Sequence, residues 1–190
     1  MNCASFWSRM MSMALIAVAL FAGALDASAQ GSRSLSTTPN VGNTITSSNS
    51  FISFNMTATQ PIRLYRFWNT FASTGTTQVD IWAHAGGVVN ANTGWFCIGS
   101  TMVNVTSTAG YVEIPVNLDF LMQPNQTWGF VISNTSISVK YTSGATLQFS
   151  NADLAIDLTS RCAGTGTGNP TTNVTNFSFS LCTRQWCGKV

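Results

Sequence analysis

The stretch FISFNMTA, at residues 51–58, decides the fold class of this chain. Its apolar residues Ile52, Phe54 and Met56 alternate with polar residues, a period of two that is typical of a β-strand with one buried face. The same alternation recurs along the chain at residues 62–64, 79–83, 112–118, 128–132, 137–141, 147–149, 154–158 and 177–181. Turn residues separate most of these stretches, and no stretch has the period of an amphipathic helix. We therefore predict an all-β domain of about nine strands, an antiparallel β-sandwich with jelly-roll-like topology.

One irregularity interrupts the pattern early in the domain. Ile62 and Leu64 continue in even register, whereas Phe67 and Phe71 lie at odd positions. A β-bulge adds one residue and reverses the facing of the residues that follow. The change of register predicts a bulge at Tyr65-Arg66.

The first 29 residues have the parts of a secretory signal peptide. A short segment ending at Arg9 precedes an apolar run over residues 10–25, and Ala27-Ser28-Ala29 supplies a cleavage site. The alternative is an uncleaved membrane anchor, since the length of the run is borderline for spanning a bilayer. We expect cleavage, a secreted product with no membrane span, a flexible Ser-, Thr- and Asn-rich leader over residues 30–50, and a single domain over residues 51–190.

Cleavage also changes the number of cysteines. Cys3 is removed with the signal peptide, which leaves an even set: Cys97, Cys162, Cys182 and Cys187. In an exported chain four cysteines predict two disulfides, with three possible connectivities. A zinc site is the alternative, but no CxxC pair and no nearby histidine supports it.

Charge is scarce, and this excludes several classes of function. Only 7% of the residues are charged and the net charge is +2, against about 25% charged residues in an ordinary domain. Without a basic patch, binding to nucleic acid is not expected. The chain has one histidine and one glutamate, Glu113, so little acid–base chemistry is available. We expect no enzyme activity and no cofactor.

Several strand and turn segments match the pattern of a known kind of module: 54–58, 62–64, 79–82, Trp95 with 98–100, 121–130, and the alternating Arg184, Trp186 and Gly188. On these segments the chain resembles an uncharacterised secreted β-sandwich module of bacterial and protist extracellular surface proteins. The resemblance covers roughly residues 51–190 and implies a jelly-roll-like fold and an extracellular setting, without any catalytic residue. The four cysteines depart from the pattern of that module.

A candidate ligand-binding surface lies on the strand at 79–83. Asp80, Trp82 and His84 share one face because successive side chains of a strand point to opposite sides. Trp95 follows a Gly- and Asn-rich turn, where it is a candidate for an exposed loop tip. An exposed aromatic ring beside polar groups suits stacking on a sugar ring. The alternatives are an ordinary solvated face, or Trp82 covered by a loop.

Two further sets of residues are candidates for ions or glycans. The oxygen-bearing Asn151, Asp153 and Asp157 are candidate ligands of a structural calcium ion, although their spacing also fits a plain amphipathic strand. Among the Asn-x-Ser/Thr sequons, Asn173 and Asn176 are the expected glycan acceptors if the source is eukaryotic.

These observations favour a secreted, non-catalytic structural or adhesion module. One alternative is a carbohydrate-binding module that uses exposed Trp82 and Trp95. A weaker one is a hydrolase built on the same sandwich. The expected partners are extracellular matrix or surface glycans.

Overall fold

The alternating stretch at residues 51–58 forms a central strand, β2 (Ser50–Ala58), of the largest sheet. The described residues after Arg33 belong to one compact unit, Ser34–Val190. The computed structural model describes residues 33–37, 43–44, 50–89, 93–143, 148–157, 164–165 and 184–190.

The fold is all-β, as predicted. Fifteen β segments occur among the described residues, and twelve of them have three residues or more, so the expectation of about nine strands was too low. Besides β2, they are β1 (Asn43–Thr44), β3 (Ile62–Leu64), β4 (Phe67–Asn69), β5 (Gly75–Ala85), β6 (Phe96–Val105), β7 (Val112–Ile114), β8 (Phe120–Met122), β9 (Thr127–Asn134), β10 (Lys140–Ser143), β11 (Gln148–Ser150), β12 (Leu154–Asp157), β13 (Gly164–Thr165), β14 (Arg184–Trp186) and β15 (Gly188–Lys189).

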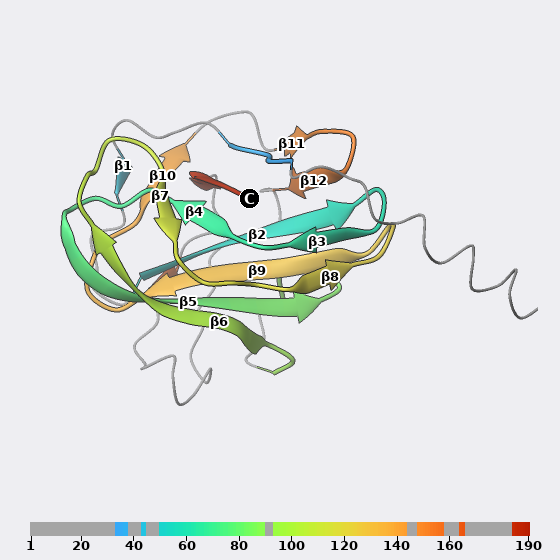
Figure 1. Ribbon diagram of the computed structural model, residues 1–190, viewed down its shortest axis with the longest axis horizontal. Helices are drawn as coiled ribbons and strands as arrows, with labels where there is room; N and C mark the ends of the chain where they lie inside the picture. Colours follow the sequence, from blue (N-terminus) through green and yellow to red (C-terminus); the bar gives the residue numbers. More distant parts are fainter. Residues whose placement is uncertain are drawn as a thin grey trace, which may run out of the picture. The chain divides into compact units, whose positions relative to one another are not determined.

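The largest sheet has seven strands in the order β11-β12-β2-β9-β5-β6, with β13 also paired to β2. All of its pairings are antiparallel. Figure 1 shows β6 along one edge of this sheet and β11 with β12 at the other. The two edges differ greatly in length, because β6 has ten residues and β11 has three.

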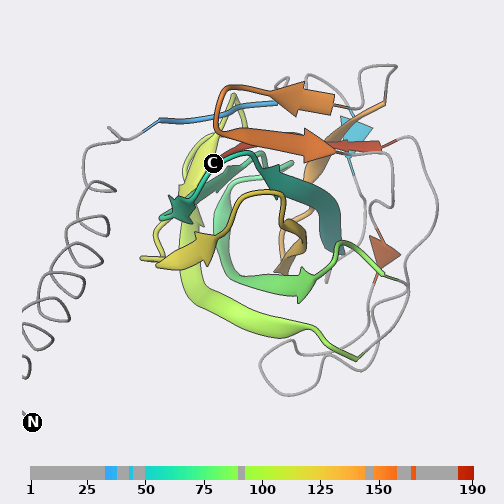
Figure 2. The same ribbon diagram turned by 90° about the vertical axis from the view of Figure 1, so that its right-hand side faces the viewer.

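Three smaller antiparallel sheets supply the second layer. Their strand orders are β15-β4-β7, β3-β8 and β1-β10-β14. Side chains of β4, β7 and β8 belong to the same buried cluster as the inward side chains of β2, β5 and β9. The two layers therefore enclose one core, which is the arrangement of a β-sandwich. Seen from the end in Figure 2, the large sheet is curved and β6 runs along its outside.

The centre of the core is aromatic. Trp186 is fully buried and lies parallel to Phe54, with ring centroids 3.9 Å apart. Phe67 meets both rings at steep angles, and Phe130 stacks on Phe54 at 5.9 Å. The indole Nε1 of Trp186 donates a hydrogen bond to Asn69 Oδ1 at 3.0 Å, so its polar atom is satisfied inside the core.

The two ends of the described chain are joined by hydrogen bonds. The backbone groups of Leu35 and Val190 exchange two hydrogen bonds. The Thr37 hydroxyl donates a hydrogen bond to the Trp186 carbonyl and accepts one from the Gly188 amide. Residues 35–37 were expected to lie in a flexible leader; they are instead paired with the last strand. Gly188 is required there, because a Cβ atom would lie 2.1 Å from the ring of Trp186.

Two local predictions were wrong. The register change near Tyr65-Arg66 is a break between β3 and β4, which pair with different strands, rather than a bulge within one strand. A bulge does occur between β5 and β6, where the register shifts between Ile81 and Trp82. The edge strand β6 was missing from the predicted alternation altogether.

Candidate functional site

Asp80, Trp82 and His84 lie on the outer face of β5, as their spacing predicts. The intervening residues Val79, Ile81 and Ala83 are fully buried in the core between the two layers. The outer face of β5 is therefore a separate surface, with β9 on one side and β6 on the other.

The loop that follows β5 folds back over this outer face. Three residues that lie side by side on β2, β9 and β5 hold it there: Asn55, Gly129 and His84. We call these three residues the loop seat. Val88 N donates a hydrogen bond to Asn55 Oδ1 at 2.7 Å, and His84 Nδ1 donates one to the carbonyl of Gly87 at 3.0 Å. A Cβ atom on Gly129 would lie 2.4 Å from Val88 N, so the loop backbone rests directly on the glycine.

The returning loop closes a second, smaller core. Trp82, Trp95, Phe51 and Val131 form a buried cluster, and Val88 packs against it. Trp82 and Trp95 are only 5% and 7% exposed. The indole of Trp82 donates to Ser133 Oγ at 3.3 Å. The expectation that Trp82 and Trp95 present an exposed stacking platform was wrong, because both rings are buried in this cluster. The alternative, in which a loop covers Trp82, is the arrangement that the structure has.

His84 is built into the same closed structure. The ring of Trp95 lies 5.2 Å from that of His84, centroid to centroid. Gly94 lies against the other ring nitrogen, since a Cβ atom added to this glycine would come within 2.8 Å of His84 Nε2. The loop therefore contacts His84 at both ring nitrogens, through Gly87 and Gly94, and His84 helps to hold the loop in place.

Asp80 is the most buried charged side chain of this face, with 1% exposure. Its Oδ1 accepts a hydrogen bond from Gln78 Nε2 at 3.2 Å, whereas its Oδ2 has no partner among the described residues. Burial raises the pKa of the neighbouring Cys97 thiol, and the charge of Asp80 raises it further. Backbone hydrogen bonds at Gly99 and Ile81 act in the opposite direction. A thiol with a raised pKa is a poor nucleophile at neutral pH.

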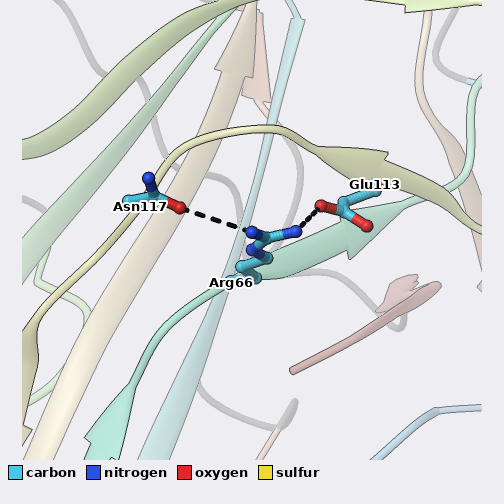
Figure 3. A network of polar contacts seen from close by, with 3 residues as sticks. All are labelled: Arg66, Glu113 and Asn117. Carbon is cyan, nitrogen blue, oxygen red and sulfur yellow. Dashed lines mark hydrogen bonds and ion pairs between the residues drawn. The ribbon is translucent and has the colours of Figure 1, made fainter.

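Two ion pairs lie on the second layer. Arg66 donates to Glu113 and, at 3.4 Å, to Asn117 Oδ1 (Figure 3). Arg63 pairs with Asp119 at 2.5 Å. Both pairs are exposed to solvent, where such interactions contribute little to stability. Glu113, the single glutamate of the chain, is occupied by this pairing.

Two of the candidate calcium ligands are used within the protein. Asn151 Oδ1 accepts hydrogen bonds from the backbone N–H groups of Asp153 and Leu154, both at 2.9 Å, and so shapes the turn before β12. Asp153 accepts a hydrogen bond from Gln60 Nε2. Asp157 lies on β12 opposite Asn55. Among the described residues, no group of three or more His, Cys, Asp or Glu side chains is placed to hold a metal ion.

Several predicted sites fall outside the described residues. These are the signal peptide at 1–29, Cys162, Cys182, Asn173 and Asn176. Cys97 is exposed and Cys187 is buried, and no disulfide joins these two described cysteines. The proposed disulfides therefore stay predictions. In the described part of the chain, no helix has the length and apolar character needed to cross a bilayer.

A second aromatic surface was not predicted. Phe96, Phe120 and Trp128, the aromatic end cluster, come from the start of β6, from β8 and from the start of β9. Trp128 meets Phe120 edge to face at 4.9 Å and Phe96 at 6.0 Å. Phe96 is 44% exposed, and Trp128 Nε1 donates to Gln126 Oε1 at 3.4 Å. Trp128 shares parity with Phe130 and packs, half-buried, against the main core, so the cluster continues that core to the end of the domain.

The imidazole of His84 and the carboxylates of Asp80 and Glu113 each contact other groups of the protein. No protein-family model matches the chain, and no curated protein matches its sequence. The resemblance to secreted surface modules therefore rests on the sequence segments alone.

Proposed function

We propose that the chain is a secreted, non-catalytic structural or adhesion module, and that it makes contact through the aromatic end cluster. The carrying observation is the partial exposure of Phe96 beside Phe120 and Trp128 at one end of the domain. Aromatic rings that are buried at their base and open at one edge are favourable contact groups, because little conformational entropy is lost when they bind.

The placement of the ionisable groups supports a role without catalysis. A general base must lie within hydrogen-bond reach of the proton that it removes. His84 instead donates to the Gly87 carbonyl and is packed against Trp95. Glu113 is paired with Arg66, and Asp80 is buried against Gln78. These engagements also weaken the hydrolase alternative.

Carbohydrate binding is the second candidate function, and the aromatic end cluster is the observation that favours it. A sugar ring is recognised by stacking on an aromatic face together with hydrogen bonds from neighbouring amides. Trp128 lies beside the exposed Gln126, whose Oε1 accepts hydrogen bonds from Trp128 Nε1 and from Gln123 N. We propose this cluster as the glycan contact in place of Trp82 and Trp95.

The remaining expectations belong to the same proposal. Residues 1–29 are removed on export, Cys97, Cys162, Cys182 and Cys187 form two disulfides, and the partners are matrix or surface glycans. The only support for a structural calcium ion at Asn151, Asp153 and Asp157 is that these side chains carry oxygen atoms, which calcium prefers as ligands. Asn173 and Asn176 are proposed to carry glycans only if the source is eukaryotic.

A retention assay tests the proposed contact surface. Beads coated with the purified chain are washed over apolar-coated glass and over arrayed glycans. We expect Phe96→Gln to reduce retention several-fold. Tyr65→Gln is the matched control, because Tyr65 is an exposed aromatic residue, at 59%, outside the cluster.

The pattern of retention separates the two functions. Binding to particular glycans that is lost in Phe96→Gln supports carbohydrate recognition, whereas loss on apolar glass alone supports adhesion without a sugar ligand. Equal retention of the wild type and Phe96→Gln on every surface overturns the proposal. Circular dichroism of each variant shows whether the fold is retained.

A further inference from the structure

The long edge strand β6 is the most unusual surface of the large sheet. It pairs with β5 from Phe96 to Val105, and no described strand pairs with its other side. Figures 1 and 2 show it as the outermost strand of that sheet. Val116 and Leu118 approach Gly99 from the core side, and the Leu118 amide donates to the Tyr65 carbonyl rather than to β6. Among the described residues, the second layer therefore covers one face of β6, and no strand pairs with its outer edge.

From Gly99 to Val105, this edge has none of the features that usually prevent pairing with another chain. Natural edge strands are kept apart by charged residues, proline, bulges or shortness. The ten residues of β6, FCIGSTMVNV, contain no Lys, Arg, Asp, Glu or Pro. Its one irregularity, the register shift opposite Ile81 and Trp82, leaves the segment from Gly99 to Val105 regular. The opposite edge, β11, has only three residues and is protected by its shortness.

The sequence of β6 suits pairing with itself. In an antiparallel pair centred on Thr101, Ser100 of one copy lies opposite Met102 of the other, and Gly99 lies opposite Val103. Ser100 and Met102 are two residues apart and point to the same, outward face of the strand, so the outward face of one copy continues into the outward face of the other. A twofold contact brings the same strand together with itself, so a strand that carries charges of one sign meets the same sign on its partner, and like charges opposite each other are destabilising. An uncharged strand avoids that repulsion, which favours a second copy over a charged partner.

We propose that β6 is an assembly edge, at which a second copy of this chain adds its own β6 antiparallel and forms a twofold dimer with one continuous sheet. The main-chain hydrogen bonds of the new ladder hold the two copies together, and the exposed Met102 is covered. Because β11 is short, assembly stops at two copies. The inference goes beyond the proposed adhesion and does not depend on it.

The oligomeric state of the purified chain tests this inference. Sedimentation velocity over a series of concentrations is expected to show a monomer–dimer equilibrium. Met102→Lys, which places a charge at the edge, is expected to raise the dissociation constant roughly tenfold or more. Tyr65→Lys is the matched control: Met102 and Tyr65 are 58% and 59% exposed, and Tyr65 lies outside β6.

A charge pair tests the register itself. Ser100→Lys alone is expected to weaken the dimer, whereas Ser100→Lys combined with Met102→Glu brings opposite charges together across the twofold axis and is expected to restore it. A monomeric wild type, a species larger than a dimer, or a dimer that Met102→Lys and Tyr65→Lys weaken equally overturns the proposal. A wild type that is monomeric but captures an extended peptide also overturns it. Phe96 precedes the register shift and lies outside the regular segment from Gly99 to Val105 that carries the proposed pairing. Phe96→Gln, which tests adhesion, is therefore expected to leave the dimer intact, so the two proposals fail separately.

Discussion

Gly129→Ala tests the claim that the outer face of β5 is closed by a loop resting on the sheet. The added Cβ atom would lie 2.4 Å from Val88 N and 2.5 Å from the carbonyl carbon of Gly87, where ordinary contacts begin near 3.4 Å. The loop backbone must therefore withdraw by 1.0 Å, the difference between 3.4 and 2.4 Å. Both atoms belong to the backbone, so no side-chain rotation relieves the contact.

The expected loss of stability follows from the bonds that this withdrawal breaks. The hydrogen bond from Val88 N to Asn55 Oδ1, 2.7 Å long, cannot be kept. The hydrogen bond is partly buried, so its loss costs the lower part of the range of about 1–3 kcal/mol that applies to a fully buried donor. Forcing extra volume into a packed site costs about 1–3 kcal/mol. Because the loop relaxes outward, the two effects overlap, and we expect a loss of about 2–4 kcal/mol in the free energy of unfolding.

Urea unfolding combined with hydrogen exchange measures both parts of this prediction. The Val88 amide is expected to lose protection in Gly129→Ala, and Trp95 to become accessible to a fluorescence quencher. Gly99→Ala is the control, since its Cβ atom would meet only side-chain atoms of Val116 and Leu118, at 2.8 and 2.9 Å, which are able to shift. A loss below about 0.5 kcal/mol in Gly129→Ala, with Val88 still protected, would refute the loop seat.

Three further predictions address the core and the ionisable groups. Trp186→Ala is expected to lower the free energy of unfolding by about 3–5 kcal/mol, because it removes a buried ring stacked on Phe54; denaturant unfolding measures it. Burial raises the pKa of Tyr111, so its contribution to stability is present below about pH 10 and is lost as the pH rises through the higher folded-state value. Tyr111→Phe is expected to flatten this alkaline loss in unfolding curves taken from neutral to high pH. In protein whose disulfides have been reduced and the reductant removed, Asp80→Asn removes a charge that raises the pKa of the Cys97 thiol. The thiol is then expected to react faster with a disulfide reagent at pH 8, with Cys97→Ser as the blank, and an unchanged rate contradicts the coupling.

The sequence was sufficient to predict the strands whose two faces differ in polarity. β2, β5 and β9 follow their alternation, and the outward position of Trp82 was predicted correctly from its parity. Parity gives the side of a sheet on which a residue lies, but not what lies above it. The cover over Trp82 depends on a loop that meets Gly129, a residue far along the chain, and no local pattern marks that contact.

β6 was missed for a related reason. Its register shifts where Ile81 and Trp82 pair with it, so Ile98 falls out of phase with the later inward residues Val103 and Val105. Met102 adds an apolar residue on the exposed side. A strand with a bulge and one outward apolar residue shows no clean period of two, even though it is among the longest strands described.

The scarcity of charge and the open edge of β6 have a common physical basis. The ion pairs of Arg63 and Arg66 lie on the second layer, so β6 receives no charge from them. The side of β6 that faces outward presents the uncharged side chains of Ser100, Met102 and Asn104, none of which repels a neighbouring copy by its charge. Most proteins use charge to prevent such an edge from pairing. A chain with 7% charged residues has little charge available for this purpose, and the proposed pairing of β6 with a second copy does not require it.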